Sequence, residues 1–167
     1  SVEERNYHAF YQFLSGSPDV AASMGLNQTA ASYHFLNQGS NTRVEGVNDK
    51  EEYEETIKAM NDLGFSKESQ NRIWEIVAAL IHLGNISFVP DVSVEDNAVI
   101  SDKSKGSSIE WCAKLLGVDT SKLVDNLVTR LVTSGKGSMY SVPLTVTQAE
   151  EARDALCMET YSYLFEW

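Results

Sequence analysis

The chain of 167 residues is 43% hydrophobic and 10% aromatic, which is enough apolar material for a folded domain with its own core and excludes a disordered segment. Its formal net charge of -11, from 24 acidic and 13 basic residues, excludes a general attraction to nucleic acid or to an anionic membrane surface. An acidic partner must therefore meet a local basic patch.

The cysteines and the lack of a targeting pattern predict a cytoplasmic protein. Cys112 and Cys157 form no CxxC pair and lie among apolar or helical residues, which favours free thiols over a disulfide or a metal site. The sequence has no apolar run of about 20 residues that could span a bilayer, and it has no signal-peptide pattern.

The first half of the chain is predicted to be mainly helical. Residues 3–14 carry apolar side chains at helical spacing, and a short helix is expected from Ser17-Pro18 to Gly25, with Ser17 as its cap. Residues 33–46 mix turn formers with short extended pieces, which indicates irregular structure with room for one brief strand.

Two longer helices are expected next. Residues 49–63 have an amphipathic pattern and are followed by Gly64, a helix terminator. Ser66 is expected to cap a second helix that ends at Gly84-Asn85. This second helix is apolar on most sides, which predicts a central, buried position.

The second half predicts two β-hairpins between further helices. Residues 86–89 and 98–100 are strand candidates around an acidic turn, and residues 108–116 and 119–128 are predicted helices, the second capped by Asp119. Residues 129–142 change to β-type residues around Gly135-Lys136-Gly137, which predicts a hairpin tip.

A capping box, Thr145 to Gln148, opens the last helix, which continues to Trp167. The last turn of this helix holds three aromatic residues that need partners, and the first helix begins without a capping residue, so we expect both ends to be cuts within a larger protein. The predicted fold class is mainly α with small β hairpins (α+β).

The sequence offers no catalytic, cofactor or metal site. Ser134 to Ser138 resembles the centre of a phosphate-binding loop, but Arg130 replaces its first glycine and Gly137 replaces the magnesium-binding hydroxyl. The acidic turn 91–96 lacks the glycine and the distal glutamate of a calcium-binding loop.

The isolated polar residues have ordinary structural explanations. His8, His34 and His82 are scattered, so each is interpreted as a packing histidine. Arg5 follows Glu4 directly, and adjacent residues on a helix do not face each other. Arg5 is therefore predicted to lie on a solvated face or to pair with a group outside the chain.

One segment differs in charge from the rest of the chain. Residues 126–149 contain no carboxylate, and Arg130 and Lys136 give them a charge of +2. The sequence therefore predicts a projecting, locally basic hairpin.

Along nearly its whole length the chain resembles the motor domain of the myosin family. The matching motifs occur in the family's order and are very specific: Glu4-Arg-Asn-Tyr-His-Ala-Phe-Tyr, Phe35-Leu-Asn-Gln-Gly, Leu63-Gly-Phe, His82-Leu-Gly-Asn-Ile, Leu116-Gly-Val-Asp, Pro143-Leu-Thr-Val-Thr-Gln-Ala, Ala152-Arg-Asp-Ala-Leu and Tyr161 to Trp167.

The resemblance implies that residues 1–167 are one fragment of an ATP-driven, actin-based motor, namely its mostly helical upper subdomain with part of the actin-binding face. The family's P-loop and first switch would precede Ser1, and its second switch and relay helix would follow Trp167. ATP, magnesium and ATPase activity would then belong to the parent motor and not to this fragment. The implied partners are the actin filament and the remainder of the motor, within the cytoplasmic actin cytoskeleton, with no nucleic acid and no direct membrane contact.

In this resemblance residues 129–143 occupy the position of the family's cardiomyopathy loop, which faces actin. Arg130 and Lys136 would attract acidic actin, and Met139, Tyr140 and Val142 would add apolar contact. Ser138 lies sixteen residues before Asp154, where the family places a Thr, Glu, Asp or Ser. A serine there is similar to single-headed class I myosins, in which a heavy-chain kinase phosphorylates it.

Three alternatives stay open at this point. Ser138 could be a turn serine without regulation, because exposed serines are common in turns. The chain could be a free-standing, non-enzymatic helical binding module of myosin ancestry. A complete small enzyme is a third reading, for which the sequence offers no catalytic constellation. Cys157-Met158-Glu159 departs from the small and basic residues usual in the family and marks a divergent member.

Overall fold

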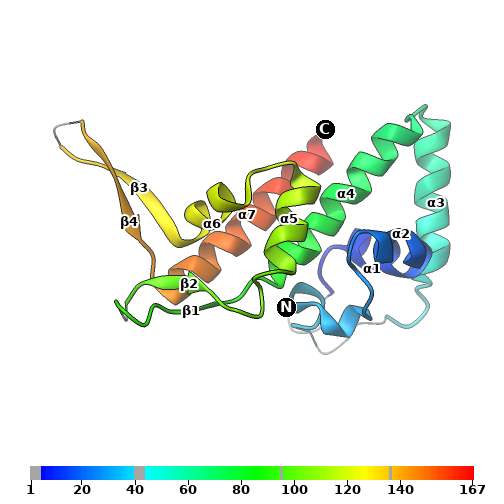
Figure 1. Cartoon of the computed structure of the whole chain (residues 1–167). Coiled ribbons are helices and arrows are strands. Elements are labelled where there is room, and N and C mark those ends of the chain that lie inside the picture. The colour runs from blue at the N-terminus through cyan, green and yellow to red at the C-terminus, as the bar shows by residue number, and fades with distance from the viewer. Residues whose placement is uncertain (1–4, 40–43, 95, 136) are drawn as a thin grey trace. The chain divides into compact units, whose positions relative to one another are not determined.

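The computed structural model describes residues 5–39, 44–94, 96–135 and 137–167. The chain divides into two compact units, Ser1–Asn85 and Ile86–Trp167, within the stretch predicted as one motor fragment. The described residues include seven α-helices and two small antiparallel sheets, which confirms the predicted α+β class (Figure 1).

The first unit contains four α-helices and two single turns of 3-10 helix. Its elements are α1 (His8–Gly16), α2 (Pro18–Ser23), η1 (Ala30–Ser32), η2 (His34–Leu36), α3 (Asp49–Asp62) and α4 (Lys67–Gly84). The side chains of Asn48 and Ser66 accept backbone N–H groups and cap α3 and α4. The two long helices and the cap at Ser66 are therefore as predicted.

Two expectations for the start of the chain were wrong. The helix predicted from residue 3 begins at His8. The Asn6 side chain instead bonds the Tyr7 N–H and the Phe35 carbonyl, which ties this stretch to another segment. Ser17 precedes α2, but its side chain makes no capping hydrogen bond, and its N–H donates to the Phe13 carbonyl at the end of α1.

Aromatic rings form the centre of the first unit. Phe13 of α1 stacks on Trp74 of α4 with ring centroids 5.2 Å apart, and Tyr53 of α3 lies 5.0 Å from the same indole. These contacts fix α1 against both long helices, as the apolar stripes of all three predict.

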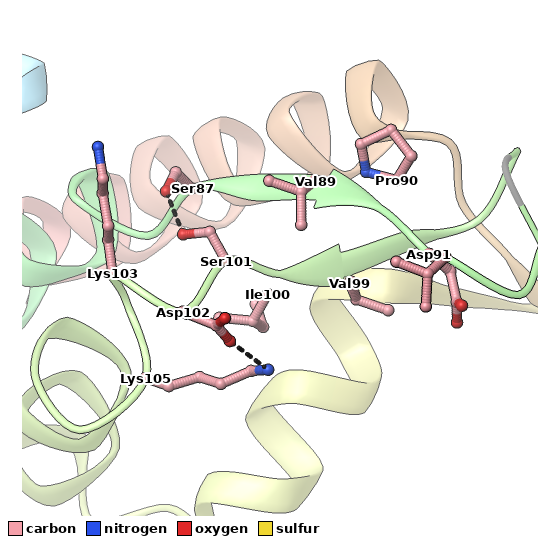
Figure 2. A pocket seen from close by; sticks show the side chains of 11 residues that line it. Ser87, Val89, Pro90, Asp91, Val99, Ile100, Ser101, Asp102, Lys103 and Lys105 are labelled. Atoms are coloured by element: carbon pink, nitrogen blue, oxygen red, sulfur yellow. Dashed lines mark hydrogen bonds and ion pairs between the residues drawn. The ribbon is translucent and has the colours of Figure 1, made fainter.

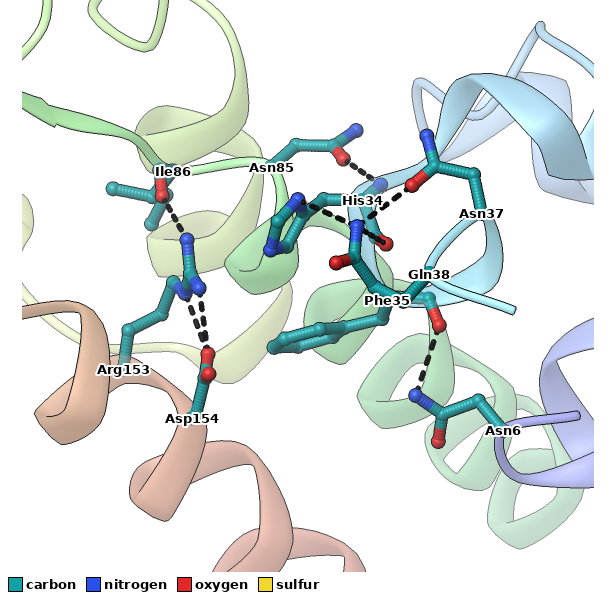
Figure 3. A network of polar contacts seen from close by, with 9 residues as sticks. All are labelled: Asn6, His34, Phe35, Asn37, Gln38, Asn85, Ile86, Arg153 and Asp154. Atoms are coloured by element: carbon teal, nitrogen blue, oxygen red, sulfur yellow. Dashed lines mark hydrogen bonds and ion pairs between the residues drawn. The ribbon is translucent and has the colours of Figure 1, made fainter. Parts of the chain in front are cut away.

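A polar network holds the irregular segment 33–38 in the first unit (Figure 3). Asn85 accepts the His34 N–H at 2.7 Å, Asn6 donates to the Phe35 carbonyl at 2.9 Å, and Gln38 donates to the His34 carbonyl at 3.0 Å. Residues from three of the family-like motifs thus meet here. The described part of residues 33–46 contains no strand, although the sequence left room for a brief one.

The histidines and Arg5 have different environments from one another. His82 is buried with Nε2 2.8 Å from the Met24 carbonyl, which confirms a packing role, whereas His8 is exposed and has no such role. Half-buried His34 contacts Gln38 and Phe35. The side chain of Arg5 is only 1% exposed and pairs with both oxygens of Asp49 at 2.9 Å, so its predicted solvated or external position was wrong.

The second unit combines three helices with two hairpins. Its elements are β1 (Phe88–Pro90), β2 (Ala98–Ile100), α5 (Ser108–Leu116), α6 (Thr120–Val128), β3 (Thr129–Thr133), β4 (Met139–Pro143) and α7 (Val146–Glu166). Strands β1 and β2 pair with each other, as do β3 and β4. Gly117 ends α5 with a φ of 70°, Asp119 caps α6, and Thr145 and Gln148 form the predicted capping box of α7.

The core of the second unit lies between its helices and includes both cysteines. Ile109, Leu123, Leu127, Cys112 and Cys157 are buried there. Both thiols are free, as expected, and burial raises the pKa of each to about 12.

Buried Arg153 joins α7 to the segment before β1 in the second unit (Figure 3). Its guanidinium donates to the Ile86 carbonyl at 2.9 Å and contacts Asp154 at 2.7 Å. The contact of Arg153 with the Ile86 carbonyl positions α7, the helix that begins just after β4.

Candidate functional site

The hairpin of β3 and β4 extends away from α6 and α7 of its own unit (Figure 1). Five pairs of residues form its ladder, from Thr129 opposite Pro143 to Thr133 opposite Met139. Strand β3 begins at Thr129, directly after α6 ends at Val128, so no linker separates the hairpin from its helix.

The base of the hairpin is fixed by further hydrogen bonds. Leu144, which is 6% exposed, donates its N–H to the Val128 carbonyl at 2.8 Å and thereby adds one rung below the ladder. Its carbonyl accepts the Ala98 N–H at 2.7 Å, which attaches the β1–β2 hairpin. These bonds attach only the base of the hairpin, so the far ends of its two strands and the tip are the part that projects.

The tip is the turn predicted around Gly135 and Gly137. Ser134 donates its N–H to the Ser138 carbonyl at 2.8 Å, and the Ser134 carbonyl accepts the Gly137 N–H at 2.9 Å. Gly137 has a φ of 83°, a left-handed conformation that favours glycine. Ser138 is exposed beside this glycine.

The strand register separates the predicted contact residues into two faces. Residues opposite each other in a ladder share a face, and neighbours along a strand alternate. Arg130 and Val142 therefore lie on one face together with Val132 and Tyr140. Met139 lies on the other face, on the side of Leu131.

Four of the predicted contact residues are exposed, namely Arg130, Ser138, Met139 and Tyr140, and Val142 is half-buried. Lys136 lies outside the described residues. The sequence reasoning missed Leu131, which is 67% exposed and comparable with Met139 at 65%. The alternation of side chains along β3 was the signal that could have found it, because it places Leu131 and Val132 on opposite faces of the strand.

A shallow cavity of about 660 Å³ lies beside the β1–β2 hairpin (Figure 2). Its polar groups bond one another: the Ser87 and Ser101 hydroxyls form one pair, and Lys105 donates to Asp102 at 3.0 Å. The hydroxyl pair and the Lys105–Asp102 pair are thus separate contacts in the lining of this cavity. Burial raises the pKa of both thiols, which favours their protonated form.

Within the described ranges no helix is long and apolar enough to cross a membrane. The same residues include no group of three or more His, Cys, Asp or Glu side chains that could hold a metal ion.

Comparison with known families decides the ancestry of the chain. The family model "Myosin head (motor domain)" matches residues 1–167, which is the whole chain. The chain belongs to the myosin head family. The resemblance inferred from the motifs is therefore confirmed.

Several curated myosins are similar to this myosin head segment. Myosin-5 of Candida glabrata is 39% identical over 170 residues, which cover 99% of the chain and 14% of the relative. Myosin-1 of Eremothecium gossypii is 39% identical over 98% of the chain and 13% of the relative. Myosin-17 of Arabidopsis thaliana is 35% identical over 100% of the chain and 11% of the relative. The chain thus spans about one-seventh or less of these relatives.

Proposed function

We propose that this segment is part of an ATP-driven, actin-based motor of the cytoplasmic actin cytoskeleton, and that the β3–β4 hairpin is its actin-facing element. One observation carries the proposal: an exposed hairpin without carboxylates extends from a chain whose net charge is -11. Such a local exception provides an attachment point for an acidic partner on a chain that would otherwise repel it.

The chemistry of the two faces supports a role in binding. Arg130 provides a charge on the same face as Tyr140, while Leu131 and Met139 provide exposed apolar area on the other face. A charge that steers the encounter and apolar side chains that exclude water are the usual components of a protein interface. Both faces could therefore contribute to contact with a filament.

We assign ATP and magnesium to other parts of the parent motor. In a phosphate-binding loop, backbone amides gather at the start of a helix. In this chain strand β4 follows the Gly-rich segment, so such an arrangement does not form at Ser138. The remainder of the motor is accordingly proposed as the second partner of this segment.

The first test reverses the charge of Arg130 in a motor domain that contains this segment. We expect Arg130→Glu to weaken actin binding in co-sedimentation by about two- to tenfold, with the difference shrinking at high salt. Lys122→Glu makes the same charge change on exposed α6, away from the hairpin, and is the matched control. Equal affinities for the two variants would refute the actin-facing assignment.

Phosphorylation of Ser138 by a heavy-chain kinase is proposed as the regulation of this element. A phosphate adds a charge of about -1.5 to -2, which nearly neutralises the +2 of the hairpin and on simple attraction would weaken actin binding. The family resemblance implies the opposite effect. A specific charge-assisted contact can outweigh such a screened long-range attraction.

The register limits where the phosphate finds its basic partner. Arg130 lies opposite Val142 in the ladder. This residue pair is four positions along the strands from the pair of Ser134 and Ser138, a distance of roughly 13 Å. This separation argues against a clamp between Arg130 and a phosphate on Ser138. A basic group on actin, or Lys136 two residues before Ser138, is the partner that stays open.

The second test compares Ser138→Ala with Ser138→Glu in the motor. We expect the glutamate variant to have an actin-activated ATPase several-fold faster than the alanine variant, because only glutamate supplies a negative charge at the tip. The same pair of substitutions at exposed Ser141, across the ladder from Leu131, is the control for charge alone. Equal rates at position 138, or a faster alanine variant, would show that Ser138 is only a turn residue.

A further inference from the structure

Ser134 makes three hydrogen bonds across the tip of the β3–β4 hairpin. Its N–H donates to the Ser138 carbonyl at 2.8 Å, and its carbonyl accepts the Gly137 N–H at 2.9 Å. Its Oγ also accepts the Ser138 N–H at 3.1 Å. One residue therefore bonds both backbone polar groups of Ser138.

These bonds close the tip around Ser138 while leaving that residue exposed. The adjoining Gly137, with a φ of 83°, is in a conformation that an extended strand does not adopt. An enzyme that binds its substrate as an extended segment needs this backbone straightened and its N–H and carbonyl groups free. Ser138 can therefore enter such a cleft only while the tip is open.

We propose that Ser134 is a positioning residue that holds the hairpin tip closed and thereby limits phosphorylation of Ser138. The inference rests on the proposed phosphorylation of Ser138 and adds the contact that limits the rate of that phosphorylation. In the modification Ser138 Oγ bonds to the γ-phosphorus of ATP, its proton passes to the base of the kinase, and ADP departs.

Of the three bonds, only the one from the Ser138 N–H to Ser134 Oγ depends on the Ser134 side chain. Ser134→Ala removes this bond and retains both backbone bonds, so the tip can still close but opens more often. The loss of one ordinary hydrogen bond raises the open fraction by about fivefold. When opening is fast, the rate of a reaction that needs the open form follows that fraction.

The experiment measures two rates on the motor domain carrying Ser134→Ala. The first is hydrogen exchange at the amides of Ser134 and Gly137, whose own bonds are to backbone carbonyls and survive the substitution. The second is phosphorylation of Ser138 by a purified serine/threonine kinase, chosen because it phosphorylates a linear peptide of residues 132–142. We expect both rates to rise by about the same factor, near fivefold.

Two controls separate the turn from other effects. Ser134→Thr keeps the hydroxyl acceptor and should return both rates to those of the unmodified sequence. In the linear peptide, where an isolated hairpin is marginal at best, Ser134→Ala should leave the phosphorylation rate unchanged. A change in the peptide would instead report a sequence preference of the kinase and would overturn the inference.

The inference is also overturned if phosphorylation of the Ser134→Ala motor is unchanged or slower, or if the exchange rates of the two amides do not rise. Failure of the proposed function has a different signature. In that case phosphorylated and unphosphorylated motors would have equal actin-activated ATPase, whatever residue occupies position 134.

Discussion

Gly84 ends α4 at a point where there is no room for a side chain. A Cβ built at this position lies 2.4–2.8 Å from ring atoms of Phe35, in the segment that Asn6 and Asn85 hold in place. The overlap includes Cγ at 2.7 Å, close to the backbone whose carbonyl Asn6 holds, so the ring cannot move away at low cost. Glycine is thus required here by space and not by backbone conformation.

We expect Gly84→Ala to destabilise the first unit by about 1–3 kcal/mol, the usual cost of overpacking a core. The measurement is chemical denaturation followed by Trp74 fluorescence in a background carrying Trp111→Phe and Trp167→Phe, since Trp74 is the tryptophan of the first unit. Gly135→Ala is the matched control, because a Cβ there meets nothing within 4 Å and the residue has no positive φ. Equal midpoints for the two variants would contradict the crowding at Phe35.

Arg5 shows what sequence reasoning cannot find at the residue scale. Its charge was visible, but its partner Asp49 lies 44 residues away, and no local pattern connects the two. The Tyr11 ring, 4.5 Å from the guanidinium, adds a cation–π contact. Long-range pairs of this kind follow from the packing of helices and are set only when the chain folds.

At the element scale, local chemistry predicted most of the fold. Ser66, Asp119 and Thr145 cap the helices where their side chains were expected to act, and Gly117 ends α5 in the left-handed conformation. These signals are short-range, so a single sequence contains them. Ser17 had the same kind of signal, but its side chain makes no capping hydrogen bond in the structure.

The hairpin was predicted from its β-type residues and its Gly-rich tip, but its faces required the register. The sequence grouped Met139 with Tyr140 because both are apolar, and the ladder places these neighbours on opposite sides. Leu131 was missed for the same reason. Composition identified the surface, and only the pairing of strands showed which side chains act together.

At the scale of the whole molecule, the two buried thiols connect stability to pH. Burial is the main cause that raises the pKa of Cys112 and of Cys157 to about 12, while an unfolded thiol ionises near pH 9. Above pH 9 the unfolded chain therefore loses protons that the folded chain keeps, and ionisation favours unfolding. The stabilisation is complete below pH 9 and falls as the pH rises towards 12.

We expect the free energy of unfolding to fall by about 1.4 kcal/mol for each thiol between pH 8 and pH 10, as the unfolded thiol ionises and the buried thiol does not. Denaturant titrations between pH 8 and pH 10 would measure this fall, to which Tyr11 and Tyr33 add with the same sign because burial raises their pKa as well. Cys157→Ala should remove about half of the thiol contribution, whatever its effect on stability at pH 7. A free energy that stays flat across this range would show that the thiols are accessible to water.

The rung that Leu144 adds below the hairpin ladder has a mechanical consequence. A pull on the tip passes down both strands, and at the base one strand continues into α6 while the other continues through Leu144 into capped α7. Because no long flexible linker lies at the base of either strand, the force reaches α6 and α7 of the second unit at the same time. A force that separates the two strands at their base must therefore break the hydrogen bond between Leu144 and Val128 first.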